Sequence, residues 1–462
     1  MKPFNFYHLT DLHYYANEVI GSYGKYYELR EMVDQKCVDK SGAIIDSAFD
    51  TIAEDKETEI VLISGDLTYD GEVQSHDALV KKLADLKSKG KRVYVTFATH
   101  DFHMEAKKFT DDGEYFLPKY TRDELREKYA DFGFNEAIAE HKESYSYCVQ
   151  LTEDTRLLAL NDDGDCEEFC GYYNDLLQWI KLQVEDANRA GCKIFAMTHH
   201  PVLEPSPIYP LFFHRNMLGG YEFTAPYLAD LGIEYIFVGH THIHDINSLT
   251  TKNGNKMYQI NTAALSAYPL AYRKINFSDD GMDVKSVQVE KIDADTDGLT
   301  VLEYAKKHFT AMIELVFETL ENDFEKFIML SKGFSGNEKL FRKFRPVMQK
   351  FGGVLNSLTF KKFCRLFGCS KYLDKSIEDK KIVRFICDVI INLYSGNEIY
   401  SPDTAEYKAF LPVCKKLGKI VKLKDSQGNP VALDKLIAGV LYDNGVGDIN
   451  AFLPSKNVNI NR

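Results

Sequence analysis

The sequence lacks several features that mark common classes of protein. No stretch reaches the roughly 18 consecutive apolar residues that a transmembrane helix needs, so we expect no membrane span. The opening MKPFNFYHLTDLHYY has no apolar run typical of a signal peptide, and none of the nine cysteines form a C-x-x-C pair. We therefore expect a cytoplasmic protein whose thiols are reduced and mostly buried.

The chain also lacks an excess of positive charge. The chain has 56 Lys and Arg against 69 Asp and Glu, a net charge of −13. Such an acidic chain is a poor candidate for a general nucleic-acid or anionic-membrane binder, and we expect no nucleic-acid partner. A small anionic substrate remains compatible with this charge, because a bound metal can reverse the sign locally. The composition leaves the oligomeric state open.

The chain has no internal repeat or low-complexity tract, and its 462 residues are too many for one ordinary core. Residues 1–292 alternate short apolar runs with helical patterns, which favours an α/β layered fold. The runs KMYQINTA, AYRKINF and VKSVQVEKI follow one another without helices. We expect these three to form a second, more antiparallel sheet.

The character of the sequence changes at the acidic segment DADTDG, residues 293–298. Its aspartates match the first positions of an EF-hand loop, but Tyr304 stands where that loop needs a glutamate. We interpret it as a solvated turn before a helix. Residues 299–462 predict a mainly helical C-terminal domain of unknown role, beginning with one amphipathic helix over 299–330.

Five short polar motifs follow five predicted strands. They contribute Asp11 and His13 in TDLH, Asp66 in SGDL, Thr99, His100 and Asp101 in ATHD, His199 and His200 in THHP, and His240 and His242 in GHTH. Ligand sites of open α/β sheets gather at the carboxyl ends of the strands, and carboxylates with imidazoles suit first-row metals. Alternate residues of an extended segment point the same way, so D-x-H and H-x-H could each supply two ligands.

The order D-x-H, G-D, H-D, H-H-P, G-H-x-H, with GDLTYDGE and VGHTH, resembles the calcineurin-like metallophosphoesterase superfamily over residues 4 to about 290. The resemblance implies a four-layer αββα sandwich and a centre of two metal ions, Mn, Fe or Zn. One metal would be held by Asp11, His13 and His242 and the other by His199 and His240, with Asp66 bridging them.

Thr99 departs from the family pattern, which has an asparagine ligand before the His-Asp pair. A threonine hydroxyl is closer to the backbone, is held by a β-branched side chain, and is a weaker metal donor than an amide oxygen. We therefore predict that the metal held by His199 and His240 binds more loosely or exchanges.

The function implied is metal-dependent hydrolysis of a phosphate mono- or diester by a metal-bound hydroxide. His100 would give a proton to the leaving group, and Asp101 would fix the tautomer of His100. We expect a small phosphorylated substrate of unspecified identity. The alternative is a degenerate homologue that acts as a ligand- or protein-binding module.

Residues for substrate binding are less well marked. The loop PSPIYPLFFHRNMLGGYEF is long and aromatic, which is typical of a functional loop, and we interpret it as a substrate lid in which Arg215 binds phosphate. His200 either faces the substrate, supports a ligand, or packs in its loop. Arg273 is predicted to be an exposed surface residue, and His103 and His244 are not predicted as ligands.

Overall fold

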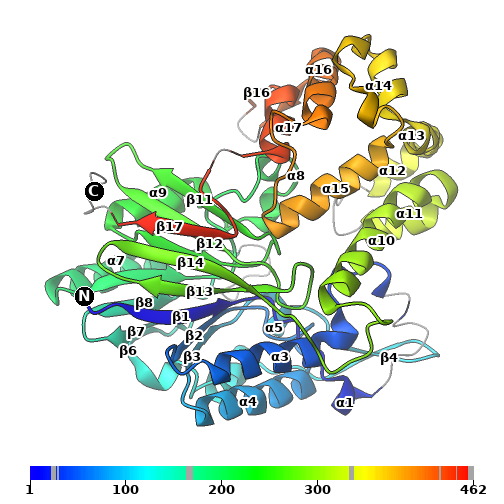
Figure 1. Cartoon of the computed structure of the whole chain (residues 1–462). Coiled ribbons are helices and arrows are strands. Elements are labelled where there is room, and N and C mark those ends of the chain that lie inside the picture. The colour runs from blue at the N-terminus through cyan, green and yellow to red at the C-terminus, as the bar shows by residue number, and fades with distance from the viewer. Residues whose placement is uncertain are drawn as a thin grey trace. The chain divides into compact units, whose positions relative to one another are not determined.

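The protein is described from a computed structural model, which covers residues 1–21, 28, 31–162, 170–331, 338–425, 428–443 and 445–455. The chain divides into two compact units. The first comprises Met1–Pro205, Arg215–Ala305 and Gly445–Arg462, and the second comprises Ser206–His214 and Lys306–Asn444. Figure 1 shows the chain coloured from the N-terminus to the C-terminus.

The first sheet of unit 1 has six strands, in the order β17-β14-β13-β1-β2-β3. Strands β1 and β2 pair in parallel, as do β2 and β3, while β13, β14 and β17 add antiparallel pairs. The strands are β1 Phe4–Leu9, β2 Ile60–Ser64, β3 Arg92–Thr96, β13 Ala271–Phe277, β14 Gly281–Gln288 and β17 Asn450–Pro454.

The second sheet has seven strands, in the order β11-β12-β10-β9-β8-β7-β6. Strands β8, β9, β10 and β12 run parallel to one another, and β6, β7 and β11 are antiparallel to their neighbours. The strands are β6 Ala137–His141, β7 Ser146–Thr152, β8 Thr155–Ala159, β9 Lys193–Met197, β10 Tyr235–Val238, β11 Asp245–Thr250 and β12 Lys256–Asn261.

The segments KMYQINTA, AYRKINF and VKSVQVEKI do not form one separate antiparallel sheet, so that prediction is wrong. Strand β12 lies in the second sheet, where it pairs in parallel with β10, whereas β13 and β14 extend the first sheet beside β1. The connection between β12 and β13 therefore passes from one sheet to the other. Both sheets are mixed, because each combines parallel pairs of strands with antiparallel pairs.

The two sheets face each other across an aromatic core. The Phe6 ring lies 5.3 Å from that of Phe195 and 5.4 Å from that of Phe237, measured between centroids. Helices α3 (Ser41–Glu54) and α4 (Val73–Ser88) cover the first sheet, and α7 (Asn174–Arg189) and α9 (Tyr221–Leu231) cover the second (Figure 1). This confirms the predicted four-layer αββα sandwich.

Shorter elements connect these layers. They are α1 Asn17–Ile20, η1 Val38–Lys40, α5 Thr99–Phe102, β4 Lys107–Phe109, β5 Glu114–Phe116, α6 Arg122–Lys128, η2 Phe134–Glu136 and η3 His214–Asn216. The DADTDG segment forms a turn in which the backbone N–H of Asp297 donates to Asp295 Oδ1 at 3.0 Å. Within the part of the chain that the structure describes, no helix is both long enough and apolar enough to cross a bilayer.

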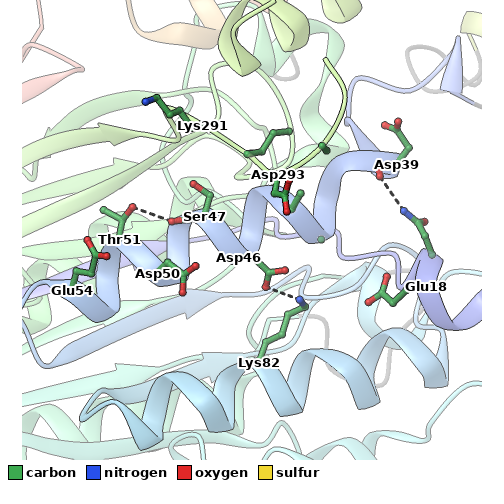
Figure 2. A pocket seen from close by; sticks show the side chains of 15 residues that line it. Glu18, Asp39, Asp46, Ser47, Asp50, Thr51, Glu54, Lys82, Lys291 and Asp293 are labelled. Atoms are coloured by element: carbon green, nitrogen blue, oxygen red, sulfur yellow. Dashed lines mark hydrogen bonds and ion pairs between the residues drawn. The ribbon is translucent and has the colours of Figure 1, made fainter. Parts of the chain in front are cut away.

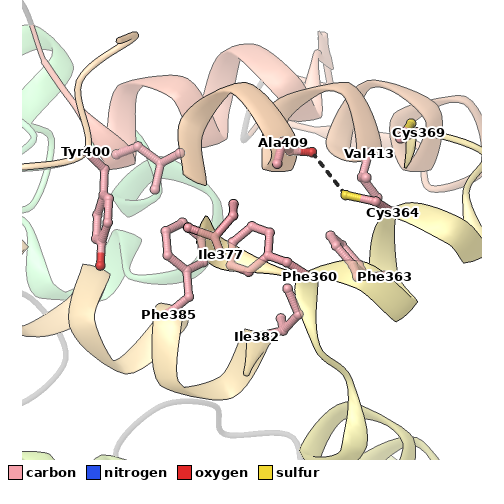
Figure 3. Packing of buried hydrophobic residues seen from close by; sticks show 11 residues of the cluster. Phe360, Phe363, Cys364, Cys369, Ile377, Ile382, Phe385, Tyr400, Ala409 and Val413 are labelled. Atoms are coloured by element: carbon pink, nitrogen blue, oxygen red, sulfur yellow. Dashed lines mark hydrogen bonds between the residues drawn. The ribbon is translucent and has the colours of Figure 1, made fainter. Parts of the chain in front are cut away.

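Unit 2 is mainly helical. Its helices are α8 Tyr209–Phe212, α10 Val301–Asn322, which begins in unit 1, α11 Phe324–Ser331, α12 Glu338–Lys343, α13 Arg345–Ser357, α14 Phe360–Leu366, η4 Ser370–Tyr372, η5 Lys375–Ile377, α15 Ile382–Ser395, α16 Ala405–Ile420 and α17 Leu433–Leu441. A small hairpin joins β15 Leu423–Lys424 to β16 Pro430–Val431. Phe360 and Phe385, with centroids 5.2 Å apart, lie at the centre of one apolar cluster (Figure 3).

Two boundaries in the C-terminal half differ from those predicted. The expected single helix over 299–330 is interrupted at Asp323, whose carboxylate accepts the backbone N–H of Lys326 at 3.1 Å and caps α11. The predicted domains were 1–292 and 299–462. Strand β17, however, returns to pair with β14 of unit 1, because Met282 and Leu453 are partners in the ladder and both are fully buried.

Most of the described cysteines are buried, as expected, and Cys170 is half-buried. The free and buried thiols are Cys37, Cys148, Cys192, Cys364, Cys369, Cys387 and Cys414. Cys166 lies outside the described residues.

Candidate metal centre

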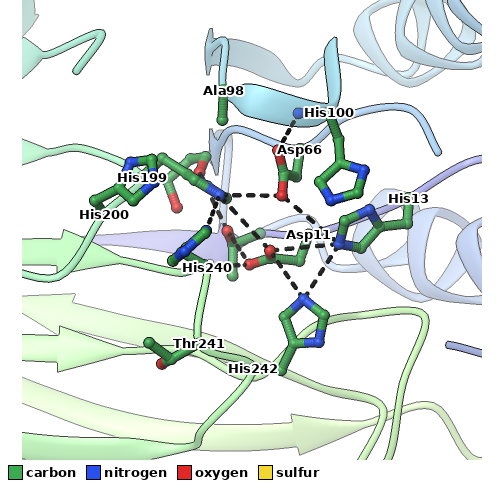
Figure 4. Close-up of polar contacts among 12 residues, drawn as sticks. Asp11, His13, Asp66, Ala98, His100, His199, His200, His240, Thr241 and His242 are labelled. Atoms are coloured by element: carbon green, nitrogen blue, oxygen red, sulfur yellow. Dashed lines mark hydrogen bonds and ion pairs between the residues drawn. The ribbon is translucent and has the colours of Figure 1, made fainter. Parts of the chain in front are cut away.

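The five predicted motifs meet at one end of the two sheets. Strands β1, β2 and β3 of the first sheet run parallel, as do β9 and β10 of the second, so their carboxyl ends lie on the same side. Figure 4 shows the side chains of Asp11, His13, Asp66, His199, His240 and His242 converging from these ends. The structure thus brings together all six predicted metal ligands.

The backbone at these ligands is unusual. Asp11, His13, Asp66, His240 and His242 have φ values of 51°, 42°, 50°, 67° and 59°. Residues other than glycine rarely adopt this left-handed conformation, which costs of order 1–3 kcal/mol each. The extended geometry expected for D-x-H and H-x-H is therefore wrong. Sharp turns, rather than strand alternation, aim each pair of side chains at the same point.

Two glycines permit the close approach of these turns. A Cβ at Gly65 would lie 2.7 Å from Ala98 Cβ and 2.8 Å from His199 Nδ1, and Gly65 itself has φ of 86°. A Cβ at Gly239 would overlap Thr10 Oγ1 and Asp11 Oδ2. The glycines of the SGD and GHTH motifs are thus required by packing around the ligands.

One group of donors comprises Asp11, His13 and His242. Asp11 Oδ1 lies 3.5 Å from His13 Nε2 and 3.3 Å from His242 Nε2, and the two imidazole nitrogens are 3.2 Å apart. The other carboxylate oxygen of Asp11 accepts the hydroxyl of Thr10 at 2.7 Å and the backbone N–H of His240 at 3.0 Å. These two hydrogen bonds turn Oδ1 toward the imidazoles.

A second group comprises Asp66, His199 and His240. Asp66 Oδ2 lies 3.1 Å from His199 Nε2, which is 3.3 Å from His240 Nδ1. The same carboxylate oxygen is 3.7 Å from His13 Nε2, so Asp66 joins the two groups. Its Oδ1 accepts the backbone N–H of His100 at 3.0 Å, which leaves Oδ2 for the centre.

The donor set fits metal ions. Two ligands about 2.1 Å from a shared tetrahedral centre are about 3.4 Å apart, which matches the 3.2–3.5 Å separations in the group of Asp11, His13 and His242. Asp11 Oδ1 is buried and makes no hydrogen bond, an arrangement that is costly unless a cation satisfies the oxygen.

Partners outside the cluster fix which nitrogen His199 and His242 present to it. His199 Nδ1 donates to the carbonyl of Ser64 at 2.8 Å, and His242 Nδ1 lies 3.0 Å from Gln35 Oε1. Both rings therefore direct Nε2 to the centre, as metal-binding histidines commonly do.

The charges of the cluster are strongly interdependent. Burial opposes ionisation of Asp11 and Asp66, but the neighbouring His199 and other imidazoles hold the pKa of both carboxyls well below the usual range. Burial likewise disfavours the imidazolium of His199, yet Asp66 and Asp11 raise its pKa well above the usual value. Burial, reinforced by Lys36, lowers the pKa of His13 to about 3. The carboxylates and imidazoles of the cluster thus shift one another's pKa values by direct charge interaction.

His100 lies at the rim of the cluster, with its side chain 19% exposed. Its Nδ1 is 2.8 Å from Asp70 Oδ1 and 2.5 Å from the carbonyl of Tyr69. Burial opposes protonation of the ring, but Asp66 and then Asp70 raise its pKa above the usual value. The ring therefore carries a proton on Nδ1, and its other nitrogen, Nε2, is protonated more readily than in an ordinary histidine.

Asp101 does not contact His100 in the way that was expected. Its Oδ1 accepts the backbone N–H groups of Leu67 and Thr68 at 2.9 and 3.1 Å, and its Oδ2 accepts that of Ala98 at 2.9 Å. The carboxyl is buried, and burial together with Asp66 raises its pKa to about 8. Asp101 thus ties the loop after β2 to the loop after β3, and Asp70 takes the position expected for it beside His100.

His200 is held by a residue that the sequence argument missed. Asp162 Oδ1 lies 2.9 Å from His200 Nδ1, and Asp162 Oδ2 accepts the backbone N–H groups of His199 and His200 at 3.1 and 2.7 Å. The ring of His200 is 2% exposed and its centroid lies 4.1 Å from that of His240. A buried ring in this position supports the ligand loop.

The remaining predicted residues have mixed outcomes. Thr99 is the first residue of α5 and half-buried, and its effect on a metal stays a prediction. Arg215 is exposed in η3, and its phosphate contact also stays a prediction. The prediction that Arg273 is exposed is wrong. The guanidinium is fully buried and donates to the carbonyls of Asp448 and Asn261 at 2.7 and 2.9 Å, and burial lowers its pKa to about 9.

A sequence signal existed for two of the missed residues. Asp70 belongs to the same GDLTYDGE segment as Asp66, and Asp162 follows the apolar run of β8 just as the predicted ligands follow theirs. Gln35 had no such signal, because it lies before α3 and far from any strand end. His244 stays outside the cluster, with Nε2 2.5 Å from Ser286 Oγ.

A separate polar hollow of about 740 Å³ lies along α3 (Figure 2). Its lining includes the carboxylates of Glu18, Asp46, Asp50 and Asp293. Lys82 neutralises Asp46 at 2.6 Å. The hollow lacks the convergent imidazoles of the metal cluster, and an acidic lining alone does not identify a ligand.

A family model and several solved structures match this chain. The family model of the calcineurin-like phosphoesterases matches residues 4–244. A dimetal phosphatase from Danio rerio is 14% identical, with 62% of this chain and 96% of that chain covered and a TM-score of 0.45. The purple acid phosphatase PPD1 from yellow lupin seeds is 12% identical, with coverages of 62% and 52% and a TM-score of 0.43. No curated protein matches the chain significantly.

Proposed function

We propose, from the premise that this chain belongs to the calcineurin-like phosphoesterase family, that it hydrolyses a phosphate mono- or diester at a centre of two metal ions. The observation that carries the proposal is the position of Asp66 Oδ2, which lies 3.7 Å from His13 Nε2 and 3.1 Å from His199 Nε2. One carboxylate oxygen placed between two sets of donors is the arrangement that a bridging ligand requires.

The residues divide into two coordination sets under this proposal. Asp11, His13 and His242 would hold one ion, His199 and His240 would hold the other, and Asp66 would contact both. When bound, such ions polarise phosphoryl oxygens and make a water nucleophilic near neutral pH. Mn, Fe and Zn all accept this mixture of carboxylate and imidazole ligands. Thr99 offers a weaker donor than an amide, so we expect the second ion to be the more exchangeable one.

His100 would protonate the leaving oxygen. Its Nδ1–H faces Asp70 and the carbonyl of Tyr69, so the proton on Nε2 is the one available for transfer. The carboxylate of Asp70 stabilises the imidazolium and holds the ring in one orientation. Asp66 favours the same protonated state. After transfer, His100 keeps the Nδ1 proton and can collect another from solvent at its partly exposed edge.

The substrate would be a small phosphorylated molecule. Of the two residues predicted to contact it, Arg215 is exposed and could reach a phosphate, whereas His200 is buried beside His240. The alternative of a degenerate binding module is not favoured. A module that only binds would not need a donor set for two ions and an aligned proton donor together.

Metal analysis combined with turnover would test the proposal. We expect about two equivalents of metal per chain and hydrolysis of p-nitrophenyl or bis-p-nitrophenyl phosphate that disappears with a chelator. His100→Asn should lower kcat by roughly 10²–10⁴-fold on substrates with poor leaving groups. His103→Asn is the matched control, because His103 follows His100 by three residues and belongs to none of the candidate ligand groups among the described residues. Two bound metals with no turnover of either ester would overturn the proposal.

A further inference from the structure

One face of helix α13 exposes large apolar side chains to solvent. Phe344, Val347, Phe351 and Val354 are 46%, 66%, 59% and 46% exposed. Their spacing of three, four and three residues places them in one stripe along the helix. We call these four residues the α13 face. A continuous stripe of exposed apolar side chains indicates an interaction surface, whereas a single exposed apolar residue does not.

The α13 face is not the side by which the helix packs into its own unit. Gly352 is on the packed side, where an added Cβ would lie 3.0 Å from Leu320 Cγ and 3.0 Å from the backbone nitrogen of Glu321 in α10. Asn356 Nδ2 donates to the carbonyl of Phe317 at 3.0 Å, and Met348 packs against the cluster around Phe324. The helix therefore has a buried apolar side and, in addition, an exposed one.

Cations border the exposed stripe. Lys343, the last residue of α12, and Lys350 of α13 are both exposed. Lys350 stands one helical turn before Val354, and Lys343 Nζ lies 5.8 Å from the ring centroid of Phe344. Neither forms an ion pair with another residue of the described chain. Arg345 is 48% exposed and faces Glu325 at 3.3 Å. The net charge of −13 for the whole chain thus conceals a local surface that is cationic and aromatic.

We propose that the α13 face binds an anionic lipid bilayer, with its phenylalanines in the headgroup region and its lysines at the anionic phosphates. Phenylalanine on one side and lysine beside it is the composition of helices that lie in a membrane interface. Lysines near an anionic surface each strengthen binding about fivefold. A second copy of the chain is a poorer occupant, because a symmetric contact would bring the same lysines together.

The size of the surface fits reversible attachment. The 13 residues of α13 correspond to a length of about 20 Å at about 1.5 Å per residue. Four apolar side chains and two lysines give weaker binding than a spanning helix, and the anionic lipids supply a necessary part of it. The inference does not rest on the proposed phosphoesterase activity, since it concerns a different surface of the chain.

Vesicle sedimentation with the full-length protein tests the proposal. We expect the protein to sediment with phosphatidylcholine vesicles that contain phosphatidylserine, to do so less at higher salt, and to stay in solution with phosphatidylcholine alone. The double variant Val347→Ser, Phe351→Ser should bind the anionic vesicles about tenfold more weakly or worse. The double variant Lys343→Gln, Lys350→Gln should bind the anionic vesicles about 25-fold more weakly.

Matched controls distinguish binding through the α13 face from non-specific vesicle binding. Phe223→Ser removes a phenylalanine that is 63% exposed on α9, and Lys408→Gln removes a lysine whose side chain is 58% exposed on α16. Both should bind vesicles like the original protein. Thermal melting of every variant establishes that it is folded. As a second measurement, Phe351→Trp should show a blue shift of emission with the anionic vesicles, seen against the constant signal of Trp179.

Three results would overturn the proposal. The first is equal sedimentation of the original protein and the paired α13 variants. The second is equal sedimentation with neutral and anionic vesicles. The third is the absence of vesicle binding together with a dimer that the Val347→Ser and Phe351→Ser pair dissociates, which would make the α13 face a contact between copies of this chain.

Discussion

Gly239→Ala is expected to weaken metal binding while leaving the fold intact. The φ of Gly239 lies outside the left-handed region, so its backbone would accept a side chain. Its neighbours would not, because the added Cβ would overlap Thr10 Oγ1 and Asp11 Oδ2 and lie 2.9 Å from Thr10 Cβ. The two overlapped atoms are themselves hydrogen-bonded at 2.7 Å. The methyl group would therefore press on the contact that orients Asp11.

The size of the effect follows from these distances. Relieving the overlap requires both Thr10 and Asp11 to move by about 1 Å, because each has an atom within 2.4 Å of the added Cβ, and overpacking of this kind costs about 1–3 kcal/mol. The same movement would shift Asp11 Oδ1, which now lies 3.3 Å from His242 Nε2 and 3.5 Å from His13 Nε2. Losing an orienting contact outside a metal's ligand set typically reduces affinity about 10–100-fold, or about 1.4–2.7 kcal/mol.

Calorimetric titration of metal-free protein with Mn²⁺ or Zn²⁺ measures this loss, and thermal melting without metal measures the cost to the fold. Gly113→Ala is the control, because its added Cβ would meet no atom within 4 Å and its φ is not left-handed. The reasoning is refuted if Gly239→Ala binds metal as tightly as Gly113→Ala does. A variant that fails to fold would also refute it, because the cost would then exceed the estimate.

Three further predictions concern the surroundings of the cluster. Thr99→Asn should tighten the weaker metal about tenfold or more, since it supplies an amide oxygen; an unchanged titration would mean that residue 99 does not face the metal. Asp70→Asn should lower kcat roughly 10²-fold on an alkyl phosphate but little on p-nitrophenyl phosphate, whose leaving group needs no proton; equal losses on both esters would argue against His100 as the proton donor. Burial, aided by Asp70, raises the pKa of Glu72 from 4.5 to about 8, so the folded state binds the extra proton and stability falls as pH rises between these values. Urea unfolding at pH 5 and pH 8 should show a smaller fall in Glu72→Gln than in the original protein, because the variant keeps the contribution of Asp101, whose pKa is also raised to about 8. An identical fall in both would show that Glu72 contributes nothing to it.

The convergence of the ligands could be predicted from the sequence because it depends on local pattern and on a general property of sheets. Each apolar run specifies a strand, and the polar pair after it specifies where the strand ends. Parallel strands place all such ends on one side, so Asp66 and His199 meet although 133 positions separate them in the sequence. The threonine at position 99, where the family pattern has an asparagine, could also be recognised from the sequence, because this difference depends only on residue type.

The tertiary structure decided which partner each of these residues has. Asp101 is adjacent to His100 in sequence, but α5 turns its carboxylate toward the backbone of Leu67 and Ala98, and the loop after β2 brings Asp70 to His100 instead. Arg273 is buried because backbone carbonyls from separate segments surround its guanidinium, an environment that no local pattern of charge can reveal. The sequence by itself determined which residues gather at the strand ends and what chemistry they can support. Only the fold decided which neighbour orients each one, because hydrogen bonds depend on distances of about 3 Å between segments far apart in the chain.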